Sequence, residues 1–166
     1  MSIKTMQDLF IHELSDVHSA ERQLSKALPR LARAAENPAL ATAFETHLEE
    51  TFGQIERLDQ IVELTGFKLK RIKCAAMEGL VEEGKEVIDE IEKGPVRDAA
   101  LIGGAQKVEH YEIASYGTLA TMARELNLPE VAKLLEATLQ EEKETDEKLT
   151  LIATGGGNQK AAKAGR

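Results

Sequence analysis

The chain has 166 residues, a formal net charge of -8, 4% aromatic residues and one cysteine, and this length suits a single domain with a sizeable core. Because phosphate binding requires clustered Lys and Arg, the acidic balance argues against a nucleic-acid partner, and the lone Cys74 excludes a disulfide framework or a Cys-rich zinc module. No stretch reaches the roughly 18 apolar residues of a membrane span, and the first residues lack the pattern of a signal peptide. We therefore expect a cytoplasmic protein that does not bind membranes.

Composition and spacing both predict helices. The chain is rich in Ala, Leu, Glu, Lys and Gln, and its apolar residues recur at steps of three and four, as in amphipathic helices. Helix ends are marked by a cap at Thr5, by Asn37-Pro38, by Gly66, by Gly94-Pro95 and by Pro129. The predicted long helices cover about 5–36, 38–66, 95–126 and 129–152, and a shorter, Gly-interrupted helix lies within about 74–92.

This order of elements predicts the fold class. Two long helices, a long connection with a short extra helix, and two more long helices form the arrangement of an all-α, ferritin-like four-helix bundle with one crossover. The predicted domain covers residues 1–154. Residues 155–166 are Gly-rich and then basic, with no apolar face, and we expect them to form a flexible tail.

Acidic and amide side chains occupy positions that the helical spacing assigns to the core. At about 100° per residue, Glu21 falls in the centre of the apolar stripe of the first helix, and Glu109 and Glu112 fall within that of the third. The fourth helix places Glu142 and Asp146 inward. The second helix has Gln54 within its apolar stripe and Glu50 at the edge of that stripe. The candidate metal ligands are Glu21, Glu50, Gln54, Glu109, Glu112, Glu142 and Asp146.

These side chains also share one height in the bundle. Glu21, Glu50, Glu109 and Glu142 each lie roughly 12 to 16 residues from a helix start, which is about 20 Å along a bundle of about 40 Å. Burying several carboxylates together costs several kcal/mol per ion and adds mutual repulsion. Lys and Arg are absent from these faces, so metal ions or protons must compensate the charge. Four carboxylates with nearby partners suit a di-iron or di-manganese centre.

The segments that carry these residues resemble the YciF-type ferritin-like stress proteins of bacteria over nearly the whole chain. They are DLFIHELSDVHSAERQL, HLEETFGQIERLDQ, AQKVEHYEIASYGTLATMA and LEATLQEEKETDEKL. A more distant likeness connects Glu109 and Glu112 with the Glu-x-x-Glu of rubrerythrins, and Glu21, Glu50 and Glu142 with their other Glu positions. The resemblance implies a stress-associated protein that binds two iron ions, with Glu50 and Glu142 bridging them.

The chain departs from rubrerythrins at the second ligand of the second and fourth helices. Rubrerythrins have Glu-x-x-His there, whereas Gly53 and Thr145 stand in the corresponding positions here. We expect the second ligand from each helix to come one residue later, from Gln54 and Asp146, because residues four apart share a helix face. The loss of two imidazoles puts peroxidase or oxygenase activity in doubt and makes manganese an alternative to iron. His47 is expected to hold a carboxylate by a hydrogen bond.

Three functions are consistent with these features. The first is a di-iron protein that oxidises Fe(II) or consumes peroxide during stress, with metal ions as its ligands and a second copy of the chain as its partner in a homodimer. The second is a metal-free helical scaffold that works by dimerisation or by binding a partner through its crossover and basic tail. The third is iron storage in a closed cage, which ranks lower because nothing in the sequence specifies such an assembly. Enzymatic turnover is left open by the residues themselves.

Overall fold

The computed structural model describes residues 3–164, and every regular element in this range is helical. The prediction of an all-α protein is therefore confirmed, with the shorter helix inside the long connection. The elements are α1 (Met6–Ala34), α2 (Pro38–Thr65), α3 (Ala75–Glu90), α4 (Pro95–Glu125), α5 (Pro129–Ile152), the π-helical turn η1 (Ala153–Gly157) and α6 (Asn158–Lys163).

The helix ends follow from local chemistry. At the start of α1, the Thr5 hydroxyl accepts a hydrogen bond from the Asp8 backbone N–H at 3.0 Å, and the Asp8 carboxylate accepts one from the Thr5 N–H at 3.1 Å. This reciprocal pair is a capping box. Gly66 ends α2 with a φ of +68°, a left-handed conformation in which glycine avoids the steric cost of a side chain. Pro95 and Pro129 begin α4 and α5, where a missing N–H costs nothing.

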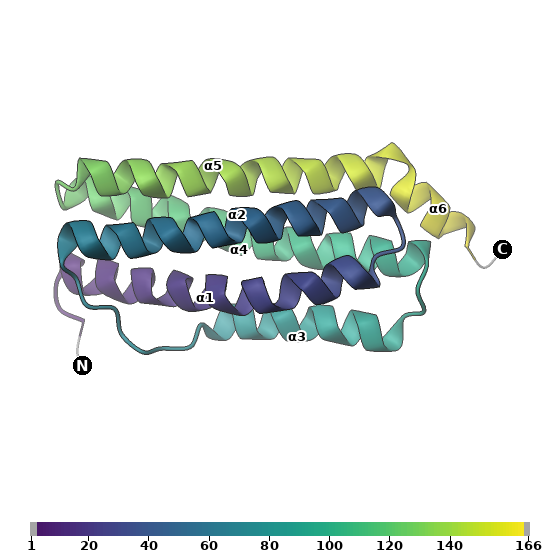
Figure 1. Cartoon of the computed structure of the whole chain (residues 1–166), viewed down its shortest axis with the longest axis horizontal. Coiled ribbons are helices and arrows are strands. Elements are labelled where there is room, and N and C mark those ends of the chain that lie inside the picture. Colours follow the sequence, from purple (N-terminus) through teal and green to yellow (C-terminus); the bar gives the residue numbers. More distant parts are fainter. Residues whose placement is uncertain (1–2, 165–166) are drawn as a thin grey trace.

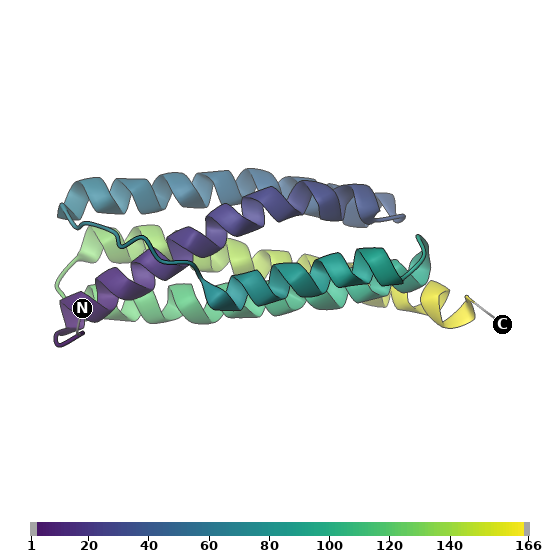
Figure 2. The same cartoon turned by 90° about the horizontal axis from the view of Figure 1, so that it is seen from below.

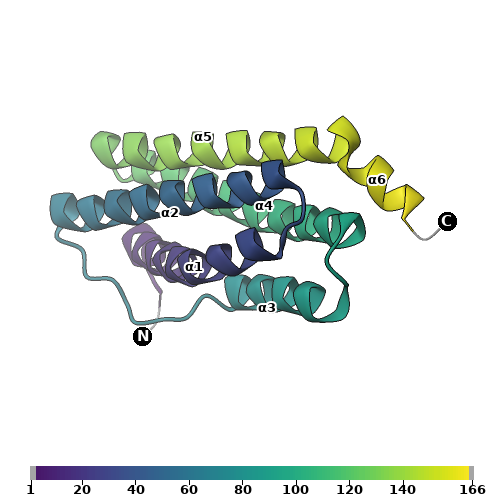
Figure 3. The same cartoon turned by 45° about the vertical axis from the view of Figure 1, so that its right-hand side comes forward.

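The long helices α1, α2, α4 and α5 form the body of the molecule (Figure 1). α1 pairs with α2, and α4 pairs with α5; the two pairs meet through contacts of α2 with α5 and of α1 with α4. α3 lies outside this group against α1 and α4, as the turned view also shows (Figure 3). Seen from below, α1 runs obliquely across the bundle between α2 and α4 (Figure 2). The result is a helical bundle with one long crossover that contains a short helix.

A layer of polar side chains divides the core into two apolar clusters. One cluster contains Leu24, Leu28, Phe44, Leu101 and Leu149, and the other contains Phe10, Leu14, Leu58, Leu119 and Leu135. On each long helix, buried polar residues separate the part that enters one cluster from the part that enters the other. We call these residues the polar layer: Glu21, His47, Thr51, Gln54, Glu109, Glu112, Thr138, Glu142 and Thr145.

The end of the chain differs from the flexible tail predicted for residues 155–166. Within the described part of this segment, Asn158–Lys163 forms α6, which contacts α4. The chain reaches that position through η1, where Gly156 has a φ of +121° that side chains rarely adopt. The missing apolar face favours a flexible tail, whereas the turn that the glycines permit brings the chain back against α4.

No helix between residues 3 and 164 has both the length and the apolar character that crossing a membrane requires.

Candidate metal centre

The polar layer holds its charged groups out of contact with solvent. Apart from its threonines, every side chain of the layer is exposed by 3% or less: Glu21, His47, Gln54, Glu109, Glu112 and Glu142. All four long helices contribute to this set. Each helix presents these residues on its apolar face because they continue the spacing of the leucines on either side.

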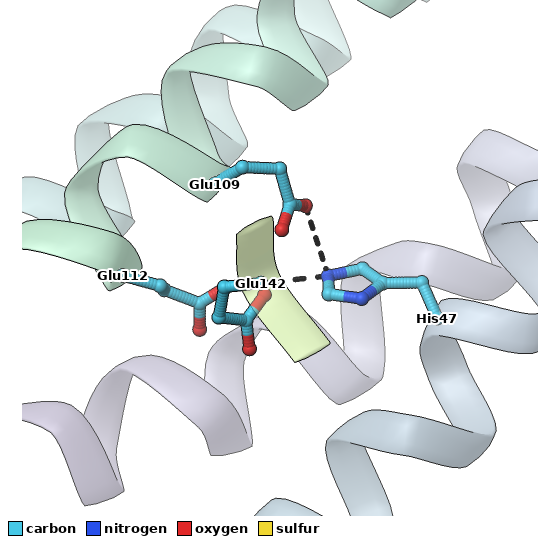
Figure 4. Close-up of side chains that lie close together, drawn as sticks. All are labelled: His47, Glu109, Glu112 and Glu142. Atoms are coloured by element: carbon cyan, nitrogen blue, oxygen red, sulfur yellow. Dashed lines mark ion pairs between the residues drawn. The ribbon is translucent and has the colours of Figure 1, made fainter. Parts of the chain in front are cut away.

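Three of the predicted ligands meet around one histidine. Potential ligand atoms of His47, Glu109, Glu112 and Glu142 all lie within 4.8 Å of one another, and we call these four residues the His–Glu group (Figure 4). The His47 Nε2 atom lies 3.1 Å from Glu109 Oε1 and 4.0 Å from Glu112 Oε2. A nitrogen from α2 and carboxylates from α4 and α5 therefore converge on one small volume, as a metal-binding site requires.

Glu21 lies beside this group on α1. Its Oε1 atom accepts a hydrogen bond from the buried hydroxyl of Tyr116, whereas its Oε2 atom has no hydrogen-bond partner within residues 3–164. Burial raises the pKa of Glu21 well above its usual value, and the negative charge of Glu142 adds to this effect. The tyrosine thus holds one oxygen of Glu21 and leaves the other available to a cation.

Burial and neighbouring negative charge also disfavour the ionised form of the two acids of α4, Glu109 and Glu112. Burial is the main cause that raises the pKa of Glu109 and of Glu112 well above the usual value, and Glu142 raises both further. Without a compensating positive charge, these carboxyl groups favour their protonated form. A divalent cation removes the conflict, because it stabilises the ionised form that burial and like charges oppose.

Unpartnered oxygens are concentrated in the same place. In the described part of the chain, both carboxylate oxygens of Glu112 and of Glu142 and one of Glu109 are buried without a hydrogen bond. Buried polar atoms in native proteins are nearly always satisfied, so an exception of this kind indicates that the atoms bind a ligand, carry a proton or belong to a strained site. The donor set is mainly carboxylate with one imidazole, which fits iron or manganese.

Gln54 is oriented by its neighbours on α2 and α5. Its amide nitrogen donates to Glu141 Oε2 at 3.1 Å, and Arg57 holds the same carboxylate with contacts of 2.5 and 2.7 Å. The amide carbonyl oxygen is left buried and without a partner among residues 3–164. Since the nitrogen is engaged, the free oxygen is the atom that Gln54 can offer to a cation.

The two remaining predicted ligands lie outside the His–Glu group. Glu50 is 25% exposed; its carboxylate accepts a hydrogen bond from Thr145 at 3.2 Å and lies 3.7 Å from Lys148 Nζ. The neighbouring His47 ring, together with Lys148, holds the pKa of Glu50 below its usual value. Asp146 is 24% exposed and pairs with the exposed His110 of α4 at 3.2 Å. Both acids have protein partners, in contrast to Glu112 and Glu142, whose carboxylate oxygens have no hydrogen bond within the described residues.

His47 was predicted to support a carboxylate, and the structure makes it a member of the group itself. The signal for this role was present in the sequence, because Phe44, His47, Thr51, Gln54 and Leu58 follow one another at steps of three and four. That spacing puts the histidine in the middle of the buried face of α2. Glu50, three residues later, lies at the edge of the same face.

Comparisons with known proteins agree with the resemblance noted from the sequence. Residues 5–162 match the family model described as a domain of unknown function, DUF892. Protein YciF of Escherichia coli (strain K12) is 62% identical over 162 residues, which are 97% of this chain and 98% of that protein. The crystal structure of the E. coli stress protein YciF has a TM-score of 0.92 and 61% identity, covering 95% of this chain and 99% of that one.

A further solved structure extends the similarity to another organism. YcfI of Rhodopseudomonas palustris is 45% identical with a TM-score of 0.88, covering 92% of this chain and 97% of that one. The family model and these relatives each span nearly the whole chain, so the likeness is not confined to a single motif. This chain therefore belongs to the DUF892 family, with the YciF-type bacterial stress proteins.

Proposed function

We propose that this protein holds two divalent metal ions in the polar layer of a ferritin-like bundle and serves in the bacterial stress response, in the cytoplasm. Iron is the first choice of metal and manganese the alternative. The observation that carries the proposal is the set of buried carboxylate oxygens that lack a hydrogen bond within the described residues, on Glu21, Glu109, Glu112 and Glu142. Buried anions without partners cost several kcal/mol each, and cations remove this cost.

The ligands divide naturally between two ions. One ion would lie within the His–Glu group, where a nitrogen and three carboxylates are within 4.8 Å of one another. The second would lie toward Glu21 and Gln54, each of which keeps one buried oxygen without a partner in residues 3–164. Glu112 and Glu142 keep two such oxygens each, so each could offer an oxygen to either ion.

The chemistry of the site depends on both the ions and the chain. When bound, two Fe(II) ions would supply the two electrons that, with two protons, reduce one hydrogen peroxide to water, so that Fe(II) oxidation and peroxide consumption are the two halves of one reaction. The residues supply hard oxygen ligands, a single imidazole, and apolar clusters on both sides that limit the access of water. The stress role is supported by the description of the 61% identical E. coli protein as a stress protein.

Metal analysis tests this proposal directly. The full chain would be purified without chelator, reconstituted anaerobically with Fe(II) or Mn(II), desalted, and its metal content measured by plasma mass spectrometry. We expect about two ions per chain, as in other dinuclear carboxylate sites. A content below about half an ion of iron, manganese or zinc per chain would overturn the proposal, because a built dinuclear site retains its metal.

The same preparation decides between this function and a metal-free scaffold. A ligand that binds only the folded state raises the melting temperature. We expect chelator to lower the melting temperature of the reconstituted protein, whereas a scaffold that works by dimerisation or partner binding would melt at the same temperature with and without chelator. Size-exclusion chromatography separates a homodimer from a storage cage by mass.

A further inference from the structure

A groove of about 360 Å³ lies on the surface between α2 and α5, beside the buried centre. Two charged residues line it, Glu50 from α2 and Lys148 from α5. Three hydroxyl side chains share its wall, namely Thr42, Thr46 and Thr145. The remaining lining residues, Ala39, Ala43, Leu151 and Ile152, are apolar, so the oxygen ligands that the groove offers to a hard cation are the Glu50 carboxylate and the three hydroxyl groups.

The groove leads toward the His–Glu group. Ala43 and Thr145 line it and also line a smaller pocket further inside. His47 and Glu109 line that inner pocket, and both are buried. The side chain of Ala43 is a single methyl group, so it adds little bulk between the groove and the inner pocket. The surface and the centre are therefore separated by only a few side chains at this point.

Glu50 lies at the boundary between the two spaces. Its Oε2 atom is 3.8 Å from His47 Nδ1 on the buried side, and its Oε1 atom is 3.7 Å from Lys148 Nζ on the solvent side. These are long contacts, and only the 3.2 Å bond from Thr145 has hydrogen-bond length. By contrast, Glu141, the next acid along the α2–α5 contact, is held by Arg57 at 2.5 and 2.7 Å. Glu50 is therefore held less tightly by its protein partners than Glu141 is.

The other large cavity near the centre is unsuitable for cations. It has a volume of about 280 Å³ and lies between α1, α3 and α4, with a lining that consists mostly of Leu, Val, Ala and Gly. Its charged residues, Lys107 and Glu83, are exposed and pair with each other at 2.9 Å. A divalent ion would lose hydration there without gaining oxygen ligands, which costs many kcal/mol.

We propose that divalent cations enter and leave the centre through the groove between α2 and α5, and that Glu50 is the carboxylate that captures them and passes them to His47 and Glu109. Lys148 competes with the incoming cation for Glu50 and slows its passage. This inference rests on the proposed function, because it requires a metal in the polar layer. It gives Glu50 a role in transit, and not the bridging role that the family resemblance implies.

A residue that acts in transit has a kinetic signature that a ligand does not share. Affinity depends only on the bound and free states, so a group used in passage changes the rates of uptake and release by the same factor and leaves the dissociation constant unchanged. Loss of a ligand instead weakens the bound state and appears mainly as faster release.

The uptake of Co²⁺ by the full chain is followed by stopped-flow absorbance. Its release is measured after mixing with excess chelator, and its dissociation constant is measured by chelator competition. We expect Glu50→Gln to slow uptake and release by about tenfold each, in line with the effect of local charge on association rates, and to leave the dissociation constant within about threefold. Lys148→Gln should accelerate both steps. Glu49→Gln is the matched control, because it removes the same charge from an exposed neighbouring position on α2.

Each result has a distinct meaning. Equal uptake rates in wild type, Glu50→Gln and Glu49→Gln would overturn the route. Faster release together with weaker affinity in Glu50→Gln would also overturn it, because this result would identify Glu50 as a ligand. Failure of the wild-type protein to bind Co²⁺, Fe²⁺ or Mn²⁺ would overturn the proposed function together with the route. Circular dichroism and melting temperature of each variant show whether it is folded.

Discussion

The buried acids determine how the metal-free protein responds to pH. Burial raises the folded-state pKa of Glu21, Glu109 and Glu112 well above the ordinary value of 4.5. The folded state therefore holds protons that the unfolded state releases. The stability contributed by these groups is complete below about pH 4.5 and is lost as the pH rises through the folded-state pKa values.

We expect the free energy of unfolding of chelator-treated protein to fall as the pH rises from about 5 to 8, by up to about 1.4 kcal/mol per pH unit for each proton held. Urea titrations across this range measure the slope. Glu112→Gln should make it shallower, because an amide does not titrate. The pKa of Glu50 is lowered in the folded state, so its contribution to stability is lost only as the pH falls through that pKa, which lies below the range from pH 5 to 8. A flat profile would show that the acids are not coupled to folding.

Glu142 should have opposite effects on the two forms of the protein. Its carboxylate is fully buried, with neither oxygen hydrogen-bonded in the described structure. In metal-free protein at neutral pH, we expect Glu142→Gln to raise the free energy of unfolding by about 1–3 kcal/mol, because it removes a repelling buried charge. In reconstituted protein it should remove both ions and lower stability, as measured by metal content and urea unfolding.

Glu147→Gln serves as the control for this substitution. Glu147 is an exposed residue of the same helix, and its replacement should change stability by less than about 0.5 kcal/mol in either form. If Glu142→Gln destabilised both forms equally, Glu142 would be a structural hydrogen-bonding group, and the dinuclear site would lose its central ligand.

At the scale of elements, Gly66 and Gly79 test how backbone conformation and helix propensity affect stability, because neither residue has packing neighbours. An added Cβ would meet nothing within 4 Å at Gly66 or at Gly79, but Gly66 has a φ of +68° and Gly79 lies within α3. We expect Gly66→Ala to lower the free energy of unfolding by about 1 kcal/mol, the cost of a left-handed side-chain residue. Gly79→Ala should raise it by about 0.5–1 kcal/mol, through helix propensity.

Urea unfolding of the metal-loaded protein measures both glycine variants under the same conditions. Because neither site has packing neighbours, the difference between them reports backbone conformation alone. A loss at Gly79 as large as that at Gly66 would show that α3 is not helical at that residue in solution.

At the scale of the whole molecule, metal binding and folding are one equilibrium. Helices α1, α2, α4 and α5 all contribute to the polar layer, so unfolding of the bundle dismantles the site. Stability should then rise with free metal concentration by roughly 1.4 kcal/mol per tenfold increase for each bound ion. Urea unfolding at buffered Mn²⁺ concentrations gives this slope. A slope of about 2.8 kcal/mol per tenfold change in free Mn²⁺ indicates that two ions are lost on unfolding, and a slope of about 1.4 kcal/mol indicates a mononuclear site. A slope of zero indicates that the protein has no metal site.

Local rules were sufficient to predict the helices and the inward-facing acids. Capping residues, prolines and a left-handed glycine act within a few residues, so the ends of the helices are encoded where they occur. The burial of Glu21, Glu109, Glu112 and Glu142 follows equally from spacing, because each continues the apolar stripe of its own helix.

Tertiary structure alone decided which polar groups meet. Asp146 is about 40° around the helix from Glu142, and Glu50 is about 60° from His47; at such angles, the rotation of each helix in the bundle determines whether a side chain faces the centre. That rotation results from packing across all the helices, with the crossover helix α3 against α1 and α4. It directs Asp146 to His110 and Glu50 to Lys148. The sequence alone determined helices α1 to α5 and the burial of Glu21, Glu109, Glu112 and Glu142. Packing decided that His47 joins these acids, because the relative rotation of helices depends on contacts between residues far apart in the chain.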